Sequence, residues 1–287
     1  MDVIEGIRVA AAGIASHKLR SLLTMLGIIV GVAAVIAMIS LGEGAKRAVE
    51  ESITALGTNL LYVRPGSVAR GGVRYGMGTA RTLSEDDARS ILRQCPSVLD
   101  LAPFMRGNGQ VKFGNKNWYT NVVATTPSYQ FVSSMPIESG SFFDEAAIKA
   151  KARVAVLGKT VVENLFGDVD PVGKIRRINR VAFRVIGVIK ERGGTHWYDV
   201  DDLVVIPLST GKFRLFGRDW LSGINVKVVS EDRMKEATVE IEDVLRRRHR
   251  LREGQENDFF IRSQADIIEV FGETARTMTF LLSLIHI

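Results

Sequence analysis

An uncharged, apolar run near the start of the chain is its most pronounced hydrophobic feature. Residues 22–41 (LLTMLGIIVGVAAVIAMISL) are twenty consecutive residues without a charged side chain. An α-helix rises about 1.5 Å per residue, so the run reaches roughly 30 Å, the thickness of the hydrocarbon core of a bilayer. The pattern therefore predicts a membrane-spanning helix.

A cleaved signal peptide and a buried core helix are the alternatives to a spanning helix. A signal peptide has an apolar core of roughly 7–15 residues followed by a cleavage site, whereas here apolar residues at helical spacing continue to Gly57. A buried helix of this length is unusual in a soluble core. We therefore assign residues 21–57 to the spanning helix and its extracytoplasmic extension. Lys18 and Arg20 favour an inside N-terminus, which makes residues 1–20 a cytoplasmic amphipathic segment.

Two glycines lie inside the apolar run at a spacing of four residues. Gly27 and Gly31 form a small-xxx-small pattern, which lets two membrane helices approach closely. They are therefore candidate helix-packing residues. The alternative is that they have no role, since glycine is common in membrane helices.

The pattern after the spanning helix alternates between strand and helix. A strand–helix–strand order occurs in residues 58–126 and again in residues 219–262. Ser84 and Ser230 each precede an apolar periodic stretch, as helix caps do. Gly114-Asn115 separates two β-rich runs, residues 110–113 and 116–124, and predicts a hairpin. We expect the two halves to form one mixed α/β extracytoplasmic subdomain.

The central block, residues 127–218, has a different pattern. Its β-rich runs cover residues 152–157, 181–189 and 203–206, and only one short helix, 159–166, is evident. We interpret this block as an inserted, mainly-β subdomain. The predicted fold class is thus α+β, with an N-terminal transmembrane helix followed by the two extracytoplasmic parts.

The last residues predict another helix. Ser263 and Asp266 are spaced as a helix cap, and the sequence becomes apolar all round after Arg276. We expect residues 263–287 to be a stalk helix and the truncated start of a second transmembrane helix, so that the chain is a fragment of a longer membrane protein. The alternative is an apolar C-terminal helix packed on the soluble domain.

Charge and cysteine content add little to this picture. The net charge of +6 is mild, and part of it lies in the basic residues 246–252 at the end of a predicted helix. These cations suit the helix dipole and solvent, with contact to anionic lipid as the alternative. A nucleic acid partner is not expected outside the membrane. Cys95 is the single cysteine, so it forms no internal disulfide and is interpreted as a buried structural thiol.

Candidate catalytic residues are not evident in the sequence. No G-x-x-x-x-G-K-[ST] phosphate loop is present, so the chain does not bind ATP by that motif. His196 with Asp199, Asp201 and Asp202 could hold a metal ion, but an exposed polar loop is the simpler interpretation. We therefore assign no catalytic, cofactor-binding or metal-binding residue, and we expect no cofactor.

Several motifs, taken in order along the chain, resemble one protein family. Residues 18–31 (KLRSLLTMLGIIVG) and 42–46 (GEGAK) resemble the first transmembrane helix of MacB/FtsX-like ABC transporter permeases. Five further motifs resemble the extracytoplasmic domain of that family. They are residues 155–158 (AVLG), 164–167 (NLFG), 170–174 (DPVGK), 183–188 (FRVIGV) and 202–207 (DLVVIP). The likeness covers nearly the whole chain.

The resemblance implies a non-catalytic permease subunit of a MacB-type transporter in the bacterial inner membrane. Such a subunit has four membrane helices and couples ATP hydrolysis by a separate ATPase subunit to movement of its extracytoplasmic domain, for export or efflux. The implied partners are the ABC ATPase, a second permease in a homodimer or heterodimer, membrane lipid, and in some relatives a periplasmic adaptor and an outer-membrane channel. A stand-alone, membrane-anchored sensor or binding module and an anchored metal-dependent enzyme using His196 are the competing hypotheses.

Overall fold

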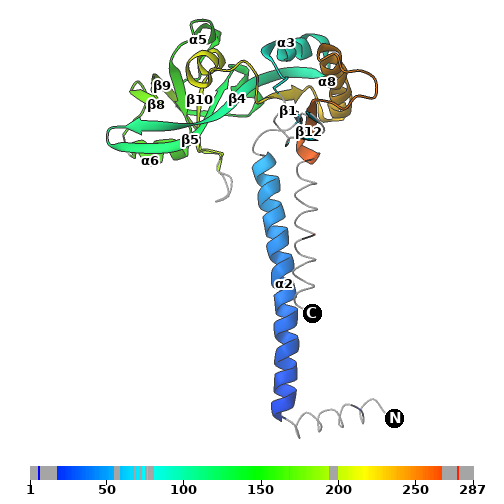
Figure 1. The fold of residues 1–287 in the computed structure, drawn as a ribbon. Helices are drawn as coiled ribbons and strands as arrows, with labels where there is room; N and C mark the ends of the chain where they lie inside the picture. Colours follow the sequence, from blue (N-terminus) through cyan, green and yellow to red (C-terminus); the bar gives the residue numbers. More distant parts are fainter. Residues whose placement is uncertain are drawn as a thin grey trace. The chain divides into compact units, whose positions relative to one another are not determined.

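The chain forms two compact units in the computed structural model (Figure 1). One unit comprises residues 1–50 and 268–287, and the other comprises residues 51–267. The structure describes residue 6 and residues 18–54, 59–67, 69–70, 73–74, 76, 81–167, 169–193, 200–266 and 277. The predicted amphipathic segment before Lys18 and the predicted second spanning helix after Asp266 lie outside the described residues, apart from Gly6 and Thr277.

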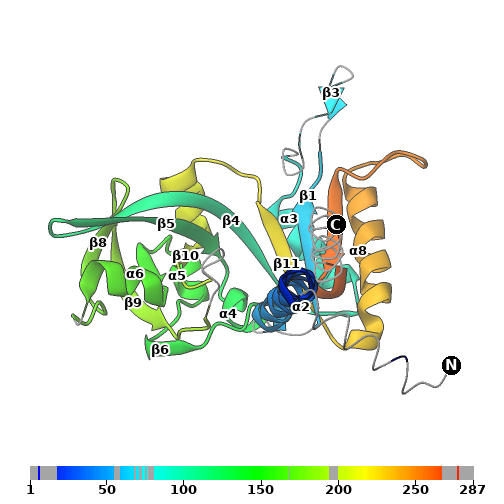
Figure 2. The same cartoon turned by 90° about the horizontal axis from the view of Figure 1, so that it is seen from below.

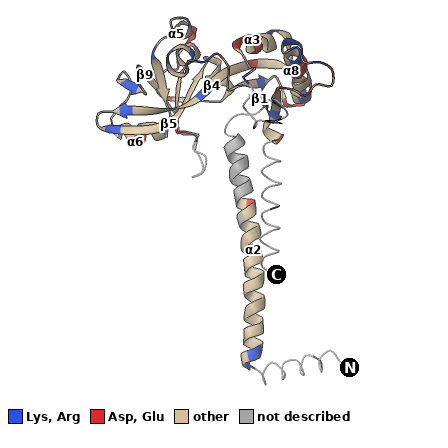
Figure 3. Cartoon of the chain, viewed as in Figure 1, with Lys and Arg blue, Asp and Glu red and all other residues tan. Residues whose placement is uncertain are grey.

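Helix α2 (Lys18–Thr54) is 37 residues long and contains the whole uncharged run. Figure 3 shows no charged residue along it between its basic N-terminal end and an acidic residue further along. Large apolar side chains such as Leu22 and Ile28 are 66% and 63% exposed, which suits a surface solvated by lipid tails. Within the described part of the chain, residues 18–44 form one helix that is long and apolar enough to cross a membrane.

A mixed sheet forms the centre of the second unit. Its ten strands are β1 (Leu60–Pro65), β4 (Val98–Phe113), β5 (Lys116–Thr125), β6 (Ile137–Gly140), β7 (Val154–Leu157), β8 (Ile175–Ile178), β9 (Val181–Ile189), β10 (Leu203–Pro207), β11 (Gly223–Val228) and β12 (Phe259–Ser263). They run in the order β12-β1-β11-β4-β5-β10-β7-β9-β6, and β8 pairs with β4 and β9 beside this path. The β5–β10 and β7–β9 pairs are parallel. Strands β2 (Ala69–Arg70) and β3 (Val73–Arg74) form a separate pair.

The helices of this unit are short, apart from two. They are α3 (Glu85–Gln94), α4 (Ser128–Val132), α5 (Glu145–Lys149), α6 (Lys159–Phe166), α7 (Leu208–Thr210) with the π-helical turn η1 (Gly211–Phe216), and α8 (Met234–Arg248) after the 3₁₀ turn η2 (Glu231–Arg233). The prediction of a single helix in the central block was wrong, because α4 and α5 also lie there. Each has five residues, too few to produce a helical periodicity. The α+β class is confirmed.

Alternating side chains give the sheet two apolar faces, each with its own core. Leu61 and Val63 of β1 belong to the core that includes residues of α3, α6 and α8. Leu60 of the same strand belongs to the core on the other face, with Tyr129 and Val132 of α4. This division follows from the period of two along a strand. Both faces are therefore covered, but by different helices.

Strands β4 and β5 form the longest ladder of the sheet (Figure 2). The predicted hairpin is confirmed, with Phe113 opposite Lys116 and Gly114 at a φ of +57° in the turn, a region that favours glycine. The β-rich run predicted at 110–113 is the end of a strand of 16 residues. Gly107 and Gly109 lie within this strand and continue the ladder opposite β5.

The predicted subdomains contribute strands to this single sheet. Strand β10 of the central block pairs with β5, and β8 of the same block pairs with β4. Hydrogen bonding is thus continuous across the proposed boundary at residue 127. The division into a mixed subdomain and an inserted subdomain at 127–218 stays a prediction.

Helix α3 begins with the capping box that its sequence predicts. The Ser84 hydroxyl accepts a hydrogen bond from the Asp87 backbone N–H, and the Asp87 carboxylate accepts one from the Ser84 backbone N–H. Cys95 is buried as expected, as is Ala88 of the same helix, whereas Leu92 is 47% exposed. Burial raises the pKa of the Cys95 thiol to about 11, which keeps it protonated and unreactive.

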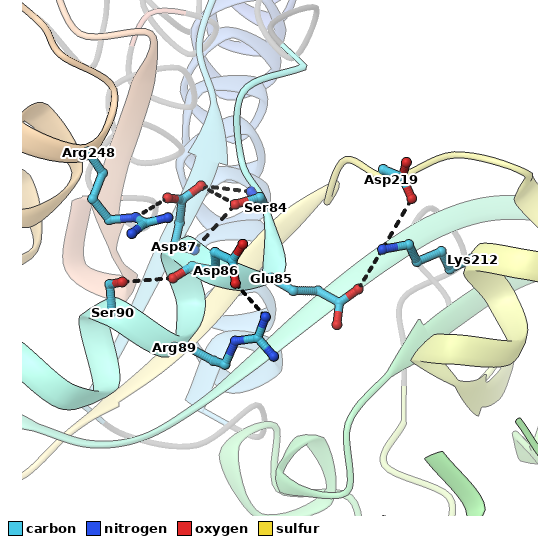
Figure 4. Close-up of polar contacts among 9 residues, drawn as sticks. All are labelled: Ser84, Glu85, Asp86, Asp87, Arg89, Ser90, Lys212, Asp219 and Arg248. Atoms are coloured by element: carbon cyan, nitrogen blue, oxygen red, sulfur yellow. Dashed lines mark hydrogen bonds and ion pairs between the residues drawn. The ribbon is translucent and has the colours of Figure 1, made fainter. Parts of the chain in front are cut away.

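Charged groups join α3 to α8 and to η1. Figure 4 shows Asp87 between Ser84 and Arg248 of α8, and Lys212 of η1 between Glu85 and Asp219. His249 also lies beside Asp87, with its Nε2 atom 3.4 Å from Oδ2 of that carboxylate. Although burial alone would raise the pKa of Asp87, hydrogen bonds from His249, Arg248 and Ser84 lower it well below its usual range.

The basic end of α8 is engaged within the domain. Arg246 donates to the carbonyl oxygens of Gln255 and Arg252 over 2.9 and 2.8 Å, so this part of the basic segment is more than a solvated helix end. The Leu251 N–H bonds to the Arg246 carbonyl and the Arg250 N–H to the Arg247 carbonyl, which is a Schellman motif. Arg250 adopts a φ of +54° there. At the start of the helix, Ser230 makes no side-chain capping bond, contrary to the prediction.

Replacing Arg250 by glycine is expected to stabilise the second unit. A non-glycine residue in the left-handed region costs roughly 1 kcal/mol, and Arg250 is exposed, so Arg250→Gly should raise the free energy of unfolding by up to that amount. Urea titration followed by tryptophan fluorescence measures the change. Arg247→Gly, inside the same helix, is the matched control and should lower the free energy by about 1 kcal/mol. Destabilisation by both substitutions would contradict the assignment.

Stability is expected to depend on pH through His249. The carboxylates of Asp258, 2.7 Å from Nδ1, and of Asp87, 3.4 Å from Nε2, raise the pKa of His249 from 6.5 to about 9. The stabilisation is therefore complete below pH 6.5 and is lost as the pH rises through 9. His249→Gln should lower the free energy of unfolding by about 2 kcal/mol at about pH 6 and change it little at about pH 10. Equal losses at both pH values would show that packing, not charge, is what the histidine contributes.

Candidate functional site

A cavity of about 520 Å³ opens on the sheet face that α4 covers. Four adjacent strands, β1, β11, β4 and β5, supply its floor, and α4 with the loop after it supplies one wall. The lining residues are Leu60, Tyr62, Arg64, Phe104, Arg106, Asn121, Tyr129, Ser133, Met135, Arg192, Val200, Asp202, Leu203, Ser222 and Asn225. Its size lies within the range of small-molecule sites, roughly 300–1,000 Å³.

Strand register brings the arginines of the floor together. Tyr62 and Arg64 of β1 share a face because they are two residues apart, as do Phe104 and Arg106 of β4. Strand β11 lies between these strands, with Gly223 opposite Phe104. A Cβ atom at Gly223 would lie only 2.6 Å from Nη1 of Arg64. Because Gly223 has no side chain, the Arg64 side chain can lie across β11 at that position.

The Arg64 guanidinium is held in one position by its surroundings. Its Cζ atom lies 5.1 Å from the ring centroid of Tyr62 and 4.8 Å from that of Phe104. Its Nη2 donates to Oδ1 of Asn225 over 3.0 Å and its Nη1 to the Val63 carbonyl over 3.1 Å. These contacts orient the planar guanidinium group.

Tyr129 lies where the positive charges of the cavity converge. Its ring is tilted against that of Phe104, with the centroids 6.3 Å apart, and it is 7% exposed. Burial raises the pKa of Tyr129, while the charges of Arg106, Arg192 and Arg64 act in the opposite direction. Three arginines from distant parts of the sequence thus act electrostatically on a single phenol.

A buried ion pair forms one wall of the cavity. The side chains of Arg192 and Asp201 are 6% and 4% exposed, with Nε and Oδ1 3.6 Å apart. The backbone N–H groups of Arg192 and Gly193 also donate to Oδ2 of Asp201, over 3.0 and 3.1 Å. Arg192 in turn donates to the Val200 carbonyl over 2.9 Å. The charge of Arg192 is therefore balanced behind the cavity surface.

The hypothesis of a metal-binding loop finds no support in the described residues. His196 and Asp199 lie outside them. Asp201 pairs with Arg192, and Asp202 accepts a hydrogen bond from Nε1 of Trp118 over 2.8 Å. Within the ranges that the structure describes, no three His, Cys, Asp or Glu side chains are grouped as metal ligands.

The candidate helix-packing residues lie together on α2. Gly27 and Gly31 are four residues apart and share one face of the helix. A Cβ atom at either position would meet no heavy atom of the described chain within 4 Å. The face is therefore open in the described structure, and a packing role for these glycines stays a prediction.

Of the cavity residues, sequence analysis considered only Asp202, and as a possible metal ligand. One pattern could have indicated the others: an arginine two residues after an aromatic residue, and so on the same face of an otherwise apolar strand. Tyr62 with Arg64 and Phe104 with Arg106 show this pattern. That signal does not reveal which strands are neighbours. The convergence of the arginines depends on the order β1-β11-β4, which pairs segments about 120 to 160 residues apart.

Comparison with known sequences identifies relatives along almost the entire chain. The family described as MacB-like periplasmic core domain matches residues 21–244. The chain is 37% identical over 284 residues to the macrolide export ATP-binding/permease protein MacB of Bdellovibrio bacteriovorus, covering 98% of this chain and 44% of that protein. It is 41% identical over 271 residues to the protein of the same name from Chlorobaculum tepidum, covering 94% and 42%. The chain thus spans less than half the length of these curated relatives.

Solved structures share the fold of the second unit at lower identity. The periplasmic region of MacB from Actinobacillus actinomycetemcomitans is 23% identical, with a TM-score of 0.63 over 76% of this chain and 94% of that one. The extracellular domain of the noncanonic ABC-type transporter YknZ from Gram-positive bacteria is 18% identical, with a TM-score of 0.58 over 71% and 100%. Together with the sequence matches, the apolar helix α2 and the mixed sheet, these likenesses establish that the chain belongs to the MacB-like ABC transporter permease family and contains its periplasmic core domain.

Proposed function

We propose that the chain is the membrane subunit of a MacB-type transporter, in which a separate ATPase subunit drives movement of the extracytoplasmic domain for export or efflux. The pairing of β1 with β12 is the observation that carries this proposal. Strand β1 follows α2 in the sequence, and β12 precedes the C-terminal apolar segment. The two strands pair antiparallel, with Leu61 opposite Ser263. The start of β1, which follows α2, and the end of β12, which precedes the C-terminal apolar segment, therefore lie next to each other at one edge of the sheet.

This arrangement suits transmission of movement into the domain. Displacement of either connection would act on a pair of strands that share five registered positions. Those strands continue through β11 into β4 without a break in the ladder. A hydrogen-bonded sheet with two buried faces resists internal deformation, so the domain would move largely as a body.

The partners follow from the same proposal. The ATPase subunit works on the cytoplasmic side of the bacterial inner membrane, and a second permease completes a homodimer or a heterodimer. A transporter of this type works either with or without a periplasmic adaptor and an outer-membrane channel, and the proposal leaves both arrangements open. Lipid surrounds α2, and Gly27 and Gly31 contact either the second membrane helix or the partner permease.

A membrane-anchored sensor or binding module is the second candidate function. The cavity lined by β1 and β4 favours a binding module, because such a protein needs only a ligand-binding site and one membrane-spanning helix. The two candidates differ in whether an ATPase is needed.

Copurification distinguishes the transporter from the sensor. The complete gene product, tagged and extracted in a mild detergent, should retain an ABC ATPase as a separate polypeptide and show ATP hydrolysis. The matched control is the same preparation with the catalytic glutamate of the ATPase substituted, which should keep the complex and lose hydrolysis. Recovery of the membrane protein without any nucleotide-binding partner would refute the transporter, and an ATPase fused in the same polypeptide would refute a separate subunit.

Substitution of the two glycines tests their role in helix packing. Gly27→Leu combined with Gly31→Leu should reduce coupled ATP hydrolysis or association with the partner helix at least several-fold, because the larger side chains prevent close approach. Ala33→Leu, on a different face of α2, is the control and should change neither quantity. Unchanged association and hydrolysis in the glycine variant would show that the pair has no packing role.

A further inference from the structure

Four neighbouring strands carry basic residues and no acidic ones. Residues 106–125 contain three Lys or Arg, residues 173–190 contain six, and neither segment contains Asp or Glu. These segments supply the C-terminal part of β4 together with β5, β8 and β9, which are hydrogen-bonded to one another in the order β5-β4-β8-β9. The net charge of the whole chain is +6, so all its other residues together are net negative. The positive charge of the chain is therefore concentrated on one part of the sheet.

Strand register places several of these cations on one face. Val111 and Ile178 belong to the core that includes residues of α6, so the alternate residues of their strands point to the opposite face. On that face Lys112 of β4 lies between Asn117 of β5 and Arg177 of β8, directly opposite each of them. Lys112 and Arg177 are both exposed. The exposed side chains across these three strands are thus an amide and two cations.

Lys112 and Arg177 are like charges at directly opposite positions of antiparallel strands. The Cβ atoms of such a pair are roughly 4.5–5.5 Å apart, and like charges there destabilise the sheet. A third exposed cation, Arg184 of β9, lies diagonally from Arg177, which is opposite Ala182. Among the residues that the structure describes, no carboxylate forms an ion pair with any of the three cations. The folded chain therefore has an electrostatic cost that an acidic partner would remove.

Two exposed apolar side chains lie beside the cations. Tyr119 of β5 is 66% exposed and Ile175 of β8 is 60% exposed. They are two residues from Asn117 and Arg177 respectively, so they point to the same face, and Ile175 is directly opposite Arg184. Tyrosine and arginine are enriched in protein interfaces and among the residues that contribute most to binding. The composition of this face is therefore that of a contact surface.

The neutral residues among the cations favour a protein over a lipid surface as the partner. Membrane-surface binding combines basic residues with large apolar residues that enter the headgroup region, whereas amides accompany the cations here. Gln110 is opposite Tyr119, and Asn117 is opposite Lys112. Each amide has both hydrogen-bond donors and an acceptor, which suits pairing with the peptide groups of a protein.

We propose that the basic sheet face, formed by Lys112, Tyr119, Ile175, Arg177 and Arg184, is a docking surface for an acidic segment of a protein partner. Carboxylates of the segment pair with the two arginines through bidentate hydrogen bonds, and its apolar residues pack on Tyr119 and Ile175. The site goes beyond the proposed transport function and does not depend on it, because binding at this face needs neither an ATPase nor a second permease.

Titration of the full chain with a defined peptide tests the proposal. The protein is reconstituted in phosphatidylcholine nanodiscs, and the probes are a labelled peptide of Glu-Val-Ser repeats and the same peptide with Gln in place of each Glu. Empty nanodiscs are the blank. The acidic peptide should bind about tenfold more tightly than its Gln counterpart, and its affinity should fall as the salt concentration rises. Equal affinity for the two peptides would overturn the proposal.

A double substitution locates the site and separates binding from folding. Lys112→Gln with Arg177→Gln should weaken binding of the acidic peptide about tenfold, because charge-assisted hydrogen bonds are lost. The same variant should unfold at a higher urea concentration, because the like-charged pair is gone. Lys235→Gln with Arg247→Gln, at exposed cations of α8, changes the net charge equally and should leave peptide binding unchanged.

The control decides between a site and the net charge of the chain. Equal weakening in the two double variants, or unchanged binding in the variant of the basic sheet face, would refute the assignment. Weaker binding together with unfolding at a lower urea concentration would reflect damaged folding and would also count against the site.

A lipid surface is the alternative occupant of the basic sheet face. Phosphatidylglycerol vesicles are added to the same nanodiscs in place of the peptide, and their binding to the native chain is compared with binding to the variant that lacks Lys112 and Arg177. A larger loss of vesicle binding than of peptide binding would overturn the proposal and identify the lipid surface as the occupant. A larger loss of peptide binding supports the acidic protein partner.

Discussion

The continuous backbone ladder through β1, β11, β4 and β5 is the constraint on which the other features of the second unit depend. These four strands come from three separate parts of the sequence, and β4 and β5 alone pair over ten registered positions. Strand β4 also pairs with β11 and β8, so it contacts strands from both predicted subdomains. A backbone N–H or C=O left unpaired in a buried sheet is costly. The strand order is therefore strongly enforced, and everything attached to these strands is placed by it.

Charged groups complement this ladder by joining the helices that cover one face of the sheet. Asp87 lies at the start of α3 and Arg248 at the end of α8, so their contact joins two helix ends of opposite dipole. Because Asp87 is 4% exposed, its charge is stabilised only while Arg248, His249 and Ser84 remain in place. Removal of any one partner leaves a buried carboxylate under-compensated. The ion pair therefore adds to the apolar packing that holds the two helices against the same core.

The sequence predicted those features that depend on local pattern. The apolar run of α2, the capping box at Ser84 and the Gly114 turn each depend on residues that are close in the chain, and all three are present in the structure. The family resemblance was likewise carried by short motifs and is confirmed.

Features that depend on strand order could not be predicted in the same way. The full length of β4 was not predicted, because a single sequence does not show that β5 pairs with the strand throughout. The cavity depends on Gly223, whose open side lets Arg64 reach Phe104 across β11. No spacing rule relates residues 64, 104 and 223, since their proximity is produced by the fold. Short helices such as α4, which supplies Tyr129, also escape periodicity arguments.

The position of the cavity links its occupancy to the strand that receives α2. Arg64 is anchored on β1, while the rings and amides that orient it belong to β4 and β11. A ligand in the cavity that contacted side chains of both strands would bridge β1 and β4 and would favour the β1–β4 distance seen here. A displacement of β1 that changed this distance would weaken ligand binding, and a bound ligand would oppose the displacement. The two effects have the same free energy, because such coupling is reciprocal. A ligand in the cavity and a force delivered through β1 would therefore act on one coordinate, the separation of the two strands.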